Sequence, residues 1–501
     1  MRNNDKIIEL KKMLKEREFY SRIGSKLYFD IECLCPKNGY NQASEDMTRI
    51  EMEKFKISHS KKFIRLVLEL HDDNEGLSDY DKILIKHLYK EYANEKNVSS
   101  KLMESFSKAS NDAYIHWLEA KENKEYNLFK PYLKRVIDLT KKMYLKRDEQ
   151  KETLYDTILA DYEENWSIKR YDEFFNRLKE ALIPLIKKVV ASKKKIRNDF
   201  LTRNVPIYKQ EEFSKFLLLK EGHDFDNLVL LTTEHPFTIN MNEGDERVTT
   251  HYFENNFLSN VFSIMHEGGH ALFDLGEPKE LKDHFISQKM TCAMHECMSR
   301  LYENMIARSE AFVNLIYPKF QELFKDEFND VSEKELFEAC NISTPSLNRC
   351  DSDELTYVLH IIIRYELEKE FINNKTNVNG LNKKWNKLYK EYLGIEVPND
   401  KEGILQDVHW TGSYGYFPTY ALGSAYAAQI YHCMKKEIDI ENAIRNDNIK
   451  LINDWLKEHA WNIASIKNPD EWIKEVTKEE FNPQYFIDYL VEKYTKLYEL
   501  K

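Results

Sequence analysis

The chain is organised around the stretch VFSIMHEGGHALFDLG, residues 261–276, which contains His266, Glu267 and His270 in an H-E-x-x-H pattern. Apolar residues recur through it at three- and four-residue intervals, which predicts an amphipathic helix. On a helix, positions i and i+4 share one face, so the two imidazoles can bind a single Zn²⁺ ion. Glu267, one residue further round, then reaches the metal-activated water as general base. The pattern is typical of metal-dependent hydrolases.

Two glycines stand inside this motif, Gly268 and Gly269. Each lowers helix stability by roughly 1 kcal/mol relative to Ala. This cost is compensated where a substrate or a packed helix must approach the helix backbone closely, because glycine has no side chain. Either Asn255 or Asn256 is a suitable N-cap for this helix. Because H-E-x-x-H also arises by chance, and paired histidines on a helix are often ordinary polar groups, the metal interpretation requires a third ligand.

The best third ligand is Glu296, 26 residues after His270. It lies in a run beginning at Gln288 that has no Pro or Gly and predicts a second helix. The gap leaves room for a loop around residues 276–278 and an antiparallel return. Two His and one returning Glu form the ligand set of gluzincins. Arg300, at i+4 from Glu296, can orient its carboxylate.

Several further blocks follow one another along the chain: HPFT (235–238), DERVTT (245–250), HEGGH (266–270), HECMSR (295–300), SLNRCDSDELTYVLHIIIRYELE (346–368) and GILQDVHWTGSYGYFPTYALGSAYAAQ (403–429). Together these blocks resemble the carboxypeptidase Taq family of metallocarboxypeptidases over most of the chain. The departures from the family pattern are small: Asn348 replaces Ile, Ser352 replaces Ala, and Cys297-Met298 stands where Ser-Gln is common. None of them removes a charge that the chemistry needs.

The resemblance implies a mostly α-helical fold, a large gluzincin-type body with a central cleft and a small β-sheet beside the metal site. It implies one divalent metal ion per chain, held by His266, His270 and Glu296. Zinc is favoured, and cobalt stays open because the same ligand set accepts several ions. The implied activity is release of single amino acids from peptides with a free C-terminus, by a homodimer.

Substrate-binding residues follow from the same resemblance. Arg349 corresponds to the family arginine implicated in binding the terminal carboxylate, a role suited to the rigid fork of a guanidinium. Residues 227–252 are rich in Val, Leu, Thr and Phe, which predicts short strands and a turn. The resemblance places this hairpin beside the active site and makes Asp245 and Arg247 cleft residues. Gln406 is a further substrate-binding candidate.

Glycines and aromatic residues crowd into residues 403–423 of an otherwise glycine-poor chain. This composition predicts a mobile loop over a cleft. Within it, His409 and either Tyr420 or Tyr416 are candidates to donate hydrogen bonds to the oxyanion or to the substrate carboxylate. Most of the 30 tyrosines must serve packing, so the choice between these donors stays open.

The remaining sequence indicates one helical unit. Residues 1–200 carry apolar residues at helical spacing, with breaks near residues 36–39 and 72–77, and are predicted to cover the cleft. Residues 201–501 are predicted to form the catalytic part, with the small sheet and the metal helices. No linker of low complexity divides them, so we expect a single domain over residues 1–501.

Charge and composition exclude several partners. The formal net charge is −11, which argues against binding to nucleic acid or to an anionic membrane. No apolar run approaches the length of a membrane span, and the charged N-terminus lacks an apolar signal core. The seven cysteines are scattered, and Cys33 and Cys35 are spaced too closely for a zinc knuckle. Reduced thiols in the cytoplasm are therefore expected.

Two other functions remain open at this stage. One is an oligopeptidase of the same helical shape that cuts internal bonds, and it would cleave an amidated peptide as well as the free acid. The other is an inactive helical scaffold that binds peptides without stoichiometric metal. The intact motif argues against the scaffold, because a binding protein has no need of a general base.

Overall fold

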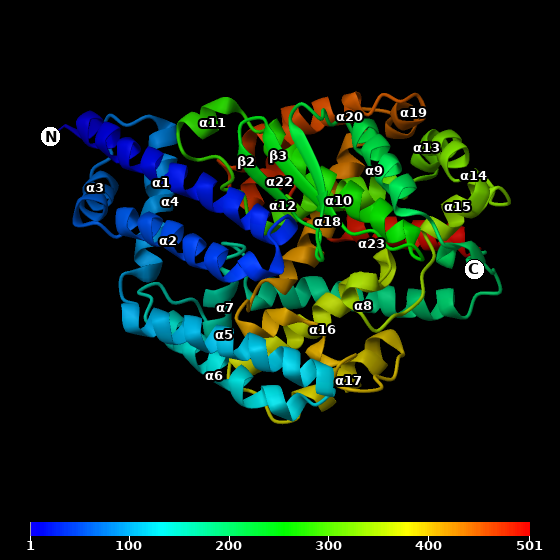
Figure 1. The fold of residues 1–501 in the computed structure, drawn as a ribbon, viewed down its shortest axis with the longest axis horizontal. Helices are drawn as coiled ribbons and strands as arrows, with labels where there is room; N and C mark the ends of the chain where they lie inside the picture. Colours follow the sequence, from blue (N-terminus) through cyan, green and yellow to red (C-terminus); the bar gives the residue numbers. More distant parts are fainter. Residues whose placement is uncertain (1) are drawn as a thin grey trace.

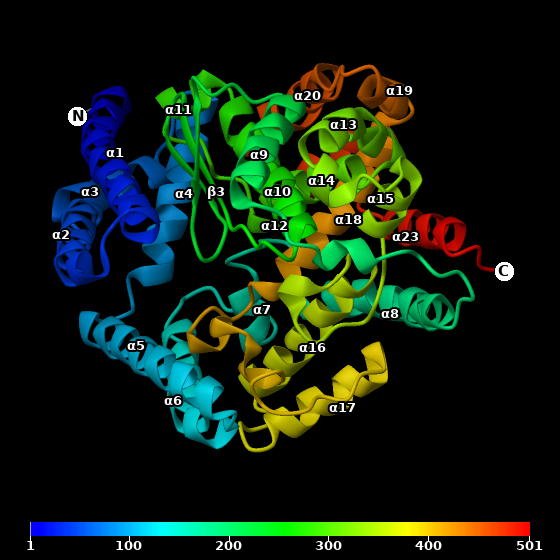
Figure 2. The ribbon, with the colours of Figure 1, turned by 45° about the vertical axis from the view of Figure 1, so that its right-hand side comes forward.

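The computed structural model describes residues 2–501 and consists mostly of α-helices around one small sheet (Figure 1). The expected fold class is therefore confirmed. The N-terminus and the C-terminus lie at opposite ends of the molecule in both views (Figures 1 and 2). Within residues 2–501, no helix combines the length and the apolar character that crossing a bilayer would require.

The first four helices pack mainly on one another. They are α1 (Asn3–Cys33), α2 (Tyr40–Ser58), α3 (Lys61–Asp72) and α4 (Asp79–Glu95). Their buried side chains, among them Leu10, Leu66 and Leu84, form a hydrophobic cluster separate from the main core. Leu281 and Ile286 from the middle of the chain complete this cluster and so attach the four helices to the body. Both predicted chain breaks are confirmed, since α1 ends before residue 36 and α3 ends at residue 72.

Most of the next helices lie below the sheet in Figure 2, and the last of them lies beside it. They are α5 (Ser100–Asn123), α6 (Tyr126–Tyr144), α7 (Leu154–Leu159), α8 (Ile168–Val190) and α9 (Ile207–Glu221). Helix α8 has the apolar face and the charged face that its sequence predicts. Phe174, Leu178 and Leu182 are buried, and charged residues cover the opposite face. These helices share the main hydrophobic core with the C-terminal half of the chain.

The sheet contains the strands β1 (Leu228–Thr232), β2 (Thr238–Asn242) and β3 (Asp245–Thr250) in the order β1-β3-β2. The predicted hairpin is formed by β2 and β3, which are antiparallel, with Thr238 opposite Val248. Gly244 turns the hairpin at φ +75°, a conformation that favours glycine. β1 pairs with β3 in parallel, with Leu230 opposite the same Val248. One face of this hairpin packs against α10 (Phe257–Gly276), and α1 packs against β2.

The second half of the chain supplies most of the core. Its further helices are α11 (Lys279–Asp283), α12 (Cys292–Arg300), α13 (Glu310–Leu323), α14 (Lys325–Phe328), α15 (Glu333–Cys340), α16 (Glu354–Ile372), α17 (Leu381–Leu393), α18 (Phe417–Met434), α19 (Ile440–Arg445), α20 (Lys450–Leu456), α21 (Asn462–Ala464), α22 (Pro469–Thr477) and α23 (Gln484–Leu497). A π-helical segment, Leu301–Ala307, continues α12 without a break. Helix α18 lies among α12, α16, α22 and α23 and is buried along nearly its whole length.

The prediction of a loop over residues 403–423 is wrong for its last part. Helix α18 begins at Phe417, with Pro418 at a helix start that tolerates proline, so Tyr420 and Gly423 are helical. The alanines that follow favour the helix, and the glycine permits close packing against α12. The preceding residues do form an irregular turn, in which Gly412 and Gly415 have positive φ.

Candidate metal centre

Helix α10 carries the H-E-x-x-H motif as predicted. It begins at Phe257 after the N-cap position of Asn256, although the Asn256 side chain makes no capping hydrogen bond. The rings of His266 and His270 lie on one face, with centroids 4.9 Å apart. The helix is therefore in place to present both imidazoles to a common point.

Both glycines of the motif are explained by close packing. A Cβ at position 269 would lie 3.0 Å from the backbone of Met298 and Ser299, so α12 could not approach α10 as closely. A Cβ at position 268 would lie 1.8 Å from the carboxylate of Glu221, which is fully buried beneath the helix. The loss of helix propensity is thus offset by close packing, against α12 at Gly269 and against Glu221 at Gly268.

Helix α12 carries Glu296 but begins at Cys292, four residues later than predicted. Residues 288–291 are held out of the helix, because Gln288 has a positive φ and the Lys289 amide binds Ser465. The helix start is fixed instead by Glu163, whose carboxylate accepts hydrogen bonds from Thr291 and from the amide of residue 293.

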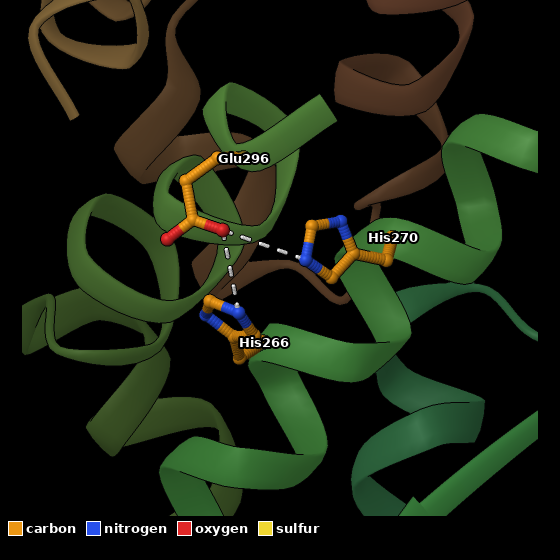
Figure 3. Close-up of side chains that lie close together, drawn as sticks. All are labelled: His266, His270 and Glu296. Atoms are coloured by element: carbon orange, nitrogen blue, oxygen red, sulfur yellow. Dashed lines mark ion pairs between the residues drawn. The ribbon is translucent and has the colours of Figure 1, made fainter. Parts of the chain in front are cut away.

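The side chains of His266, His270 and Glu296 converge on one point between the two helices (Figure 3). Glu296 Oε2 lies 3.7 Å from His266 Nε2 and 3.6 Å from His270 Nε2. The carboxylate is nearly buried, whereas the two imidazoles keep 19% and 16% of their surface exposed. The cluster is therefore partly accessible to solvent through the two histidines.

These distances fit a divalent metal ion. Ligand atoms about 2.1 Å from a tetrahedral zinc ion lie about 3.4 Å apart, close to the separations of Glu296 Oε2 from the two rings. Two imidazole nitrogens and one carboxylate oxygen are also ligands that zinc accepts, and three protein ligands leave a position for water.

The other nitrogen of His266 is held by Glu303. His266 Nδ1 lies 3.0 Å from Glu303 Oε2 and donates to it, which leaves Nε2 free of hydrogen and directed at Glu296. Glu303 belongs to the π-helical segment that continues α12. A π-helical turn shifts the register of the residues after it, and such turns are frequent at functional sites.

The other nitrogen of His270 is held by a second histidine. His270 Nδ1 and His295 Nδ1 are 2.6 Å apart, and His295 Nε2 lies 3.0 Å from Asp274 Oδ1. With a metal on Nε2 of His270, its Nδ1–H donates to His295, and His295 donates in turn to Asp274. Both imidazoles of the motif are thus oriented by acceptors on the side away from Glu296.

Arg300 compensates the charge of the two buried carboxylates, Glu296 and Glu303. Arg300 Nε donates to Glu296 Oε1 at 2.6 Å, and its terminal nitrogen donates to Glu303 at 3.0 Å. Burial raises the pKa of Glu296, but the charge of Arg300, with smaller contributions from the two neighbouring histidines, outweighs burial and holds that pKa well below its usual value. At Glu303 burial also raises the pKa, but Arg300 and the hydrogen bond from His266 outweigh burial and lower the pKa to about 2. Both carboxylates are therefore ionised at neutral pH.

Glu267 lies on the sheet side of α10. Thr238 Oγ1, at the start of β2, is 2.7 Å from Glu267 Oε2 and 2.8 Å from the Glu267 main-chain oxygen. Its hydroxyl hydrogen is shared between these two acceptors. The small sheet therefore fixes the side chain of the residue that the motif assigns as base.

Arg349 lies in a network of charges beside the aromatic residues of α18. Its Nε and one terminal nitrogen donate to Oδ1 of Asp407, at 3.3 and 3.1 Å. The other oxygen of Asp407 accepts from Arg364, which is fully buried. The Arg349 guanidinium also packs over the rings of Phe417 and Tyr420, at 5.8 and 5.3 Å from their centroids.

The three predicted hydrogen-bond donors form one aromatic cluster. The His409 ring stacks on Tyr416 with centroids 5.9 Å apart, and the Tyr416 ring meets Tyr420 edge to face at 5.0 Å. Burial raises the pKa of both phenols, so both stay protonated and can donate. Burial lowers the pKa of His409 to about 4, and the attraction of Asp407 does not offset it. His409 is therefore neutral at pH 7.

The remaining substrate-binding candidates already have protein partners. Arg247 donates to Asp245 at 2.9 and 3.2 Å and lies over the ring of Phe29 on α1. Gln406 donates to the carbonyls of residues 347 and 402 and accepts from Arg364. Asp245, Arg247 and Gln406 thus hold neighbouring elements together, and their role toward substrate stays a prediction.

The sequence interpretation did not include Glu303, His295 or Asp407 as partners of the site residues. Glu303 follows Glu296 by seven residues, the spacing of two helical turns, and His295 directly precedes Glu296. Buried polar residues on apolar helices are a usable signal, because each requires a partner. Helix propensity alone does not distinguish the π-helical segment from an α-helix, so its position could not be predicted from sequence.

Known proteins are similar to this chain over nearly its whole length, in sequence and in fold. The sequence profile of the "Carboxypeptidase Taq (M32) metallopeptidase" family matches residues 9–494. Carboxypeptidase 1 of Bacillus subtilis strain 168 is 37% identical over 97% of this chain and 98% of its own. Thermostable carboxypeptidase 1 of Thermus thermophilus is 30% identical, with 97% of each chain covered.

The fold agrees as closely as the sequence. The crystal structure of the M32 carboxypeptidase from Deinococcus radiodurans R1 superposes with a TM-score of 0.95 at 26% identity, covering 99% of this chain and 100% of that one. The resemblance noted in the sequence is thereby confirmed. The chain belongs to the carboxypeptidase Taq (M32) metallopeptidase family and is a metal-dependent carboxypeptidase.

Proposed function

We propose that this metallocarboxypeptidase releases single C-terminal residues from peptides with Glu267 as general base and a zinc ion held by His266, His270 and Glu296. The observation that carries the proposal is the convergence of these three ligand atoms, which all lie within 4.8 Å of one another. When bound, the ion supplies Lewis acidity, which acidifies water and polarises the scissile carbonyl. Cobalt is the alternative ion, since the same ligands accept it.

The proton transfers belong to Glu267. Thr238 occupies its Oε2, so Oε1 is the oxygen that takes the proton from the attacking water. The same oxygen then delivers that proton to the nitrogen of the departing amino acid. The neutral donors His409, Tyr416 and Tyr420 are the candidates to stabilise the negative charge on the carbonyl oxygen, because all three keep their hydrogens at pH 7.

Arg349 sets the position of cleavage in this proposal. Asp407 occupies the edge formed by Nε and one terminal nitrogen, and among residues 2–501 the other terminal nitrogen donates to no carboxylate or carbonyl. That free edge can bind the substrate's terminal carboxylate. Fixing the carboxylate places one residue, and only one, beyond the scissile bond.

The test compares a peptide that has a free C-terminus with its C-terminally amidated form. Mass spectrometry of the digest should show stepwise loss of single residues from the free acid, abolished by a chelator and restored by zinc. The amidated peptide should be cleaved far more slowly. Equal cleavage of both forms at internal bonds would favour the oligopeptidase, and peptide binding without chelator-sensitive hydrolysis would favour the inactive scaffold.

Assembly and location are separate parts of the proposal. The family resemblance implies a homodimer, which sedimentation of the purified protein can test. A cytoplasmic location is supported by the seven free cysteines, of which Cys33 is the last residue of α1 and Cys35 follows the helix. Fractionation of cells that produce the protein checks the location.

A further inference from the structure

Tyr357 lies on α16 between the metal cluster and the Arg349 network. Its ring covers the guanidinium of Arg300, 4.3 Å from the ring centroid, and Arg300 binds Glu296. On its other side the ring meets Tyr420 edge to face, with centroids 6.4 Å apart. The Arg349 guanidinium packs on the same Tyr420 ring. Tyr357 thus links the metal cluster to Arg349, although no sequence motif assigns it a role.

The hydroxyl of Tyr357 is buried, and no group among residues 2–501 accepts its hydrogen; the neighbouring Arg349 can only donate to its oxygen. Buried tyrosine hydroxyls normally find an acceptor. Tyr365, on the same helix, shows the usual arrangement, because its hydroxyl donates to Asp172 at 2.9 Å. The free hydroxyl of Tyr357 therefore indicates an acceptor that arrives from outside the chain.

The surrounding charges specify what kind of acceptor this is. Arg300 and Arg349 are the cations nearest the phenol, and the carboxylates beside them, Glu296 and Asp407, already bind these arginines. Burial raises the pKa of Tyr357 despite both cations, so the phenol keeps its hydrogen and donates. A site with a free guanidinium edge and a free hydroxyl fits a carboxylate, which offers two oxygens.

We propose that Tyr357 is a substrate-binding residue whose hydroxyl donates to the C-terminal carboxylate of the peptide, beside the guanidinium of Arg349. The inference rests on the role proposed for Arg349 and adds a second donor to it. The carboxylate is present in substrate and transition state alike. Loss of the hydroxyl therefore raises KM more than it lowers kcat.

The experiment uses the full-length, zinc-loaded enzyme and the variant Tyr357→Phe, which keeps the ring between Arg300 and Tyr420. The matched control is Tyr365→Phe, the same change on the same helix. With a free-acid peptide, Tyr357→Phe should raise KM roughly 10- to 100-fold, the effect of one hydrogen bond to a charged group. The control should keep the wild-type KM. Inhibition by the released amino acid should weaken in Tyr357→Phe by the same factor, since product binding needs no chemistry.

The outcomes separate this inference from the proposed function. If the wild type cleaves amidated and free peptides equally, the carboxylate role of Arg349 fails, and the role of Tyr357 fails with it. If the wild type discriminates and Tyr357→Phe has unchanged KM and product inhibition, only the inference about Tyr357 is overturned. A fall in kcat at constant KM would also overturn it, because it would place the hydroxyl on the oxyanion. Metal content and thermal unfolding of each variant verify that the site is intact.

Discussion

His266 donates to Glu303 through a hydrogen bond of 3.0 Å between ring Nδ1 and carboxylate Oε2. The bond fixes the tautomer in which Nε2 faces Glu296. Glu303→Gln keeps the shape but removes the anion that His266 requires, so we expect zinc affinity to fall roughly 10- to 100-fold. Competition with a chromophoric chelator measures this affinity directly. Glu322→Gln, an exposed carboxylate on α13, should leave it unchanged.

Gly423 determines how closely α18 approaches Glu296. A Cβ at position 423 would lie 2.7 Å from the Cβ of Glu296 and 3.0 Å from the Ala293 carbonyl. Gly423→Ala must therefore push α12 and α18 apart and displace the carboxylate. We expect lower zinc occupancy and a loss of about 1–3 kcal/mol in the free energy of unfolding.

Gly24→Ala is the matched control for that change. Gly24 is also helical, but a Cβ added there would lie 3.4 Å from the nearest atom, a carboxylate oxygen of Glu51, which is an ordinary contact. This variant should unfold within about 1 kcal/mol of the wild type and gain from the better helix propensity of Ala. Equal damage in both variants would show that the contact with Glu296 is unimportant.

Asp407 holds Arg349 with one oxygen and Arg364 with the other. Asp407→Asn leaves the fully buried Arg364 without its counter-charge, which destabilises a protein by about 3–5 kcal/mol. Arg349 also loses its orientation, so KM for free-acid peptides should rise. Urea unfolding and steady-state kinetics measure the two effects. Asp330→Asn, which weakens the exposed ion pairs with Arg197 and Arg203, should have a much smaller effect on stability and none on KM.

His409 gives the protein a defined pH dependence. Burial lowers its pKa to about 4, whereas the unfolded chain takes up the proton near pH 6.5. The unfolded state therefore binds more protons between these values, and stability falls as pH drops from 6.5 toward 4. The variant His409→Gln lacks the titrating imidazole and therefore lacks this pH-dependent contribution to stability. The stability advantage of the wild type over the variant should thus shrink by roughly 2–3 kcal/mol between pH 7 and pH 4.5.

Calorimetry at several pH values checks this difference. A constant difference across the range would mean that His409 titrates normally in the folded protein. Activity supplies an independent control: because His409 stays neutral above pH 5, His409→Gln should lower kcat without moving the acidic limb of the pH profile of kcat/KM.

The convergence of the three candidate metal ligands could be predicted from sequence because it depends on local rules. Helical spacing places His266 and His270 on one face, and the long run without Pro or Gly carries Glu296 on a second helix. Even the two glycines pointed to a close approach, which α12 and Glu221 provide. Each of these inferences needs only the periodicity of a helix and the chemistry of the ligand.

The parts that could not be predicted depend on tertiary contacts. Helix α12 starts late because Ser465 and Glu163, distant in sequence, bind the residues around its first turn. The aromatic segment after residue 417 is a buried helix because α12 and α16 surround it, which its glycines and tyrosines alone do not indicate. Tyr357 could not be singled out from sequence, because the feature that distinguishes it is a buried hydroxyl whose hydrogen no described residue accepts.

The most direct measurement of the proposed chemistry is the turnover and zinc content of Glu267→Gln, determined on the same preparation. Glu267 Oε2 contacts Thr238, and the side chain is none of the three converging ligands, so the variant should bind one zinc ion per chain as the wild type does. Its kcat on a free-acid peptide should fall by several orders of magnitude, since the amide that replaces the carboxylate cannot take the proton. A fully zinc-loaded Glu267→Gln enzyme with wild-type kcat would contradict the assignment of Glu267 as the base.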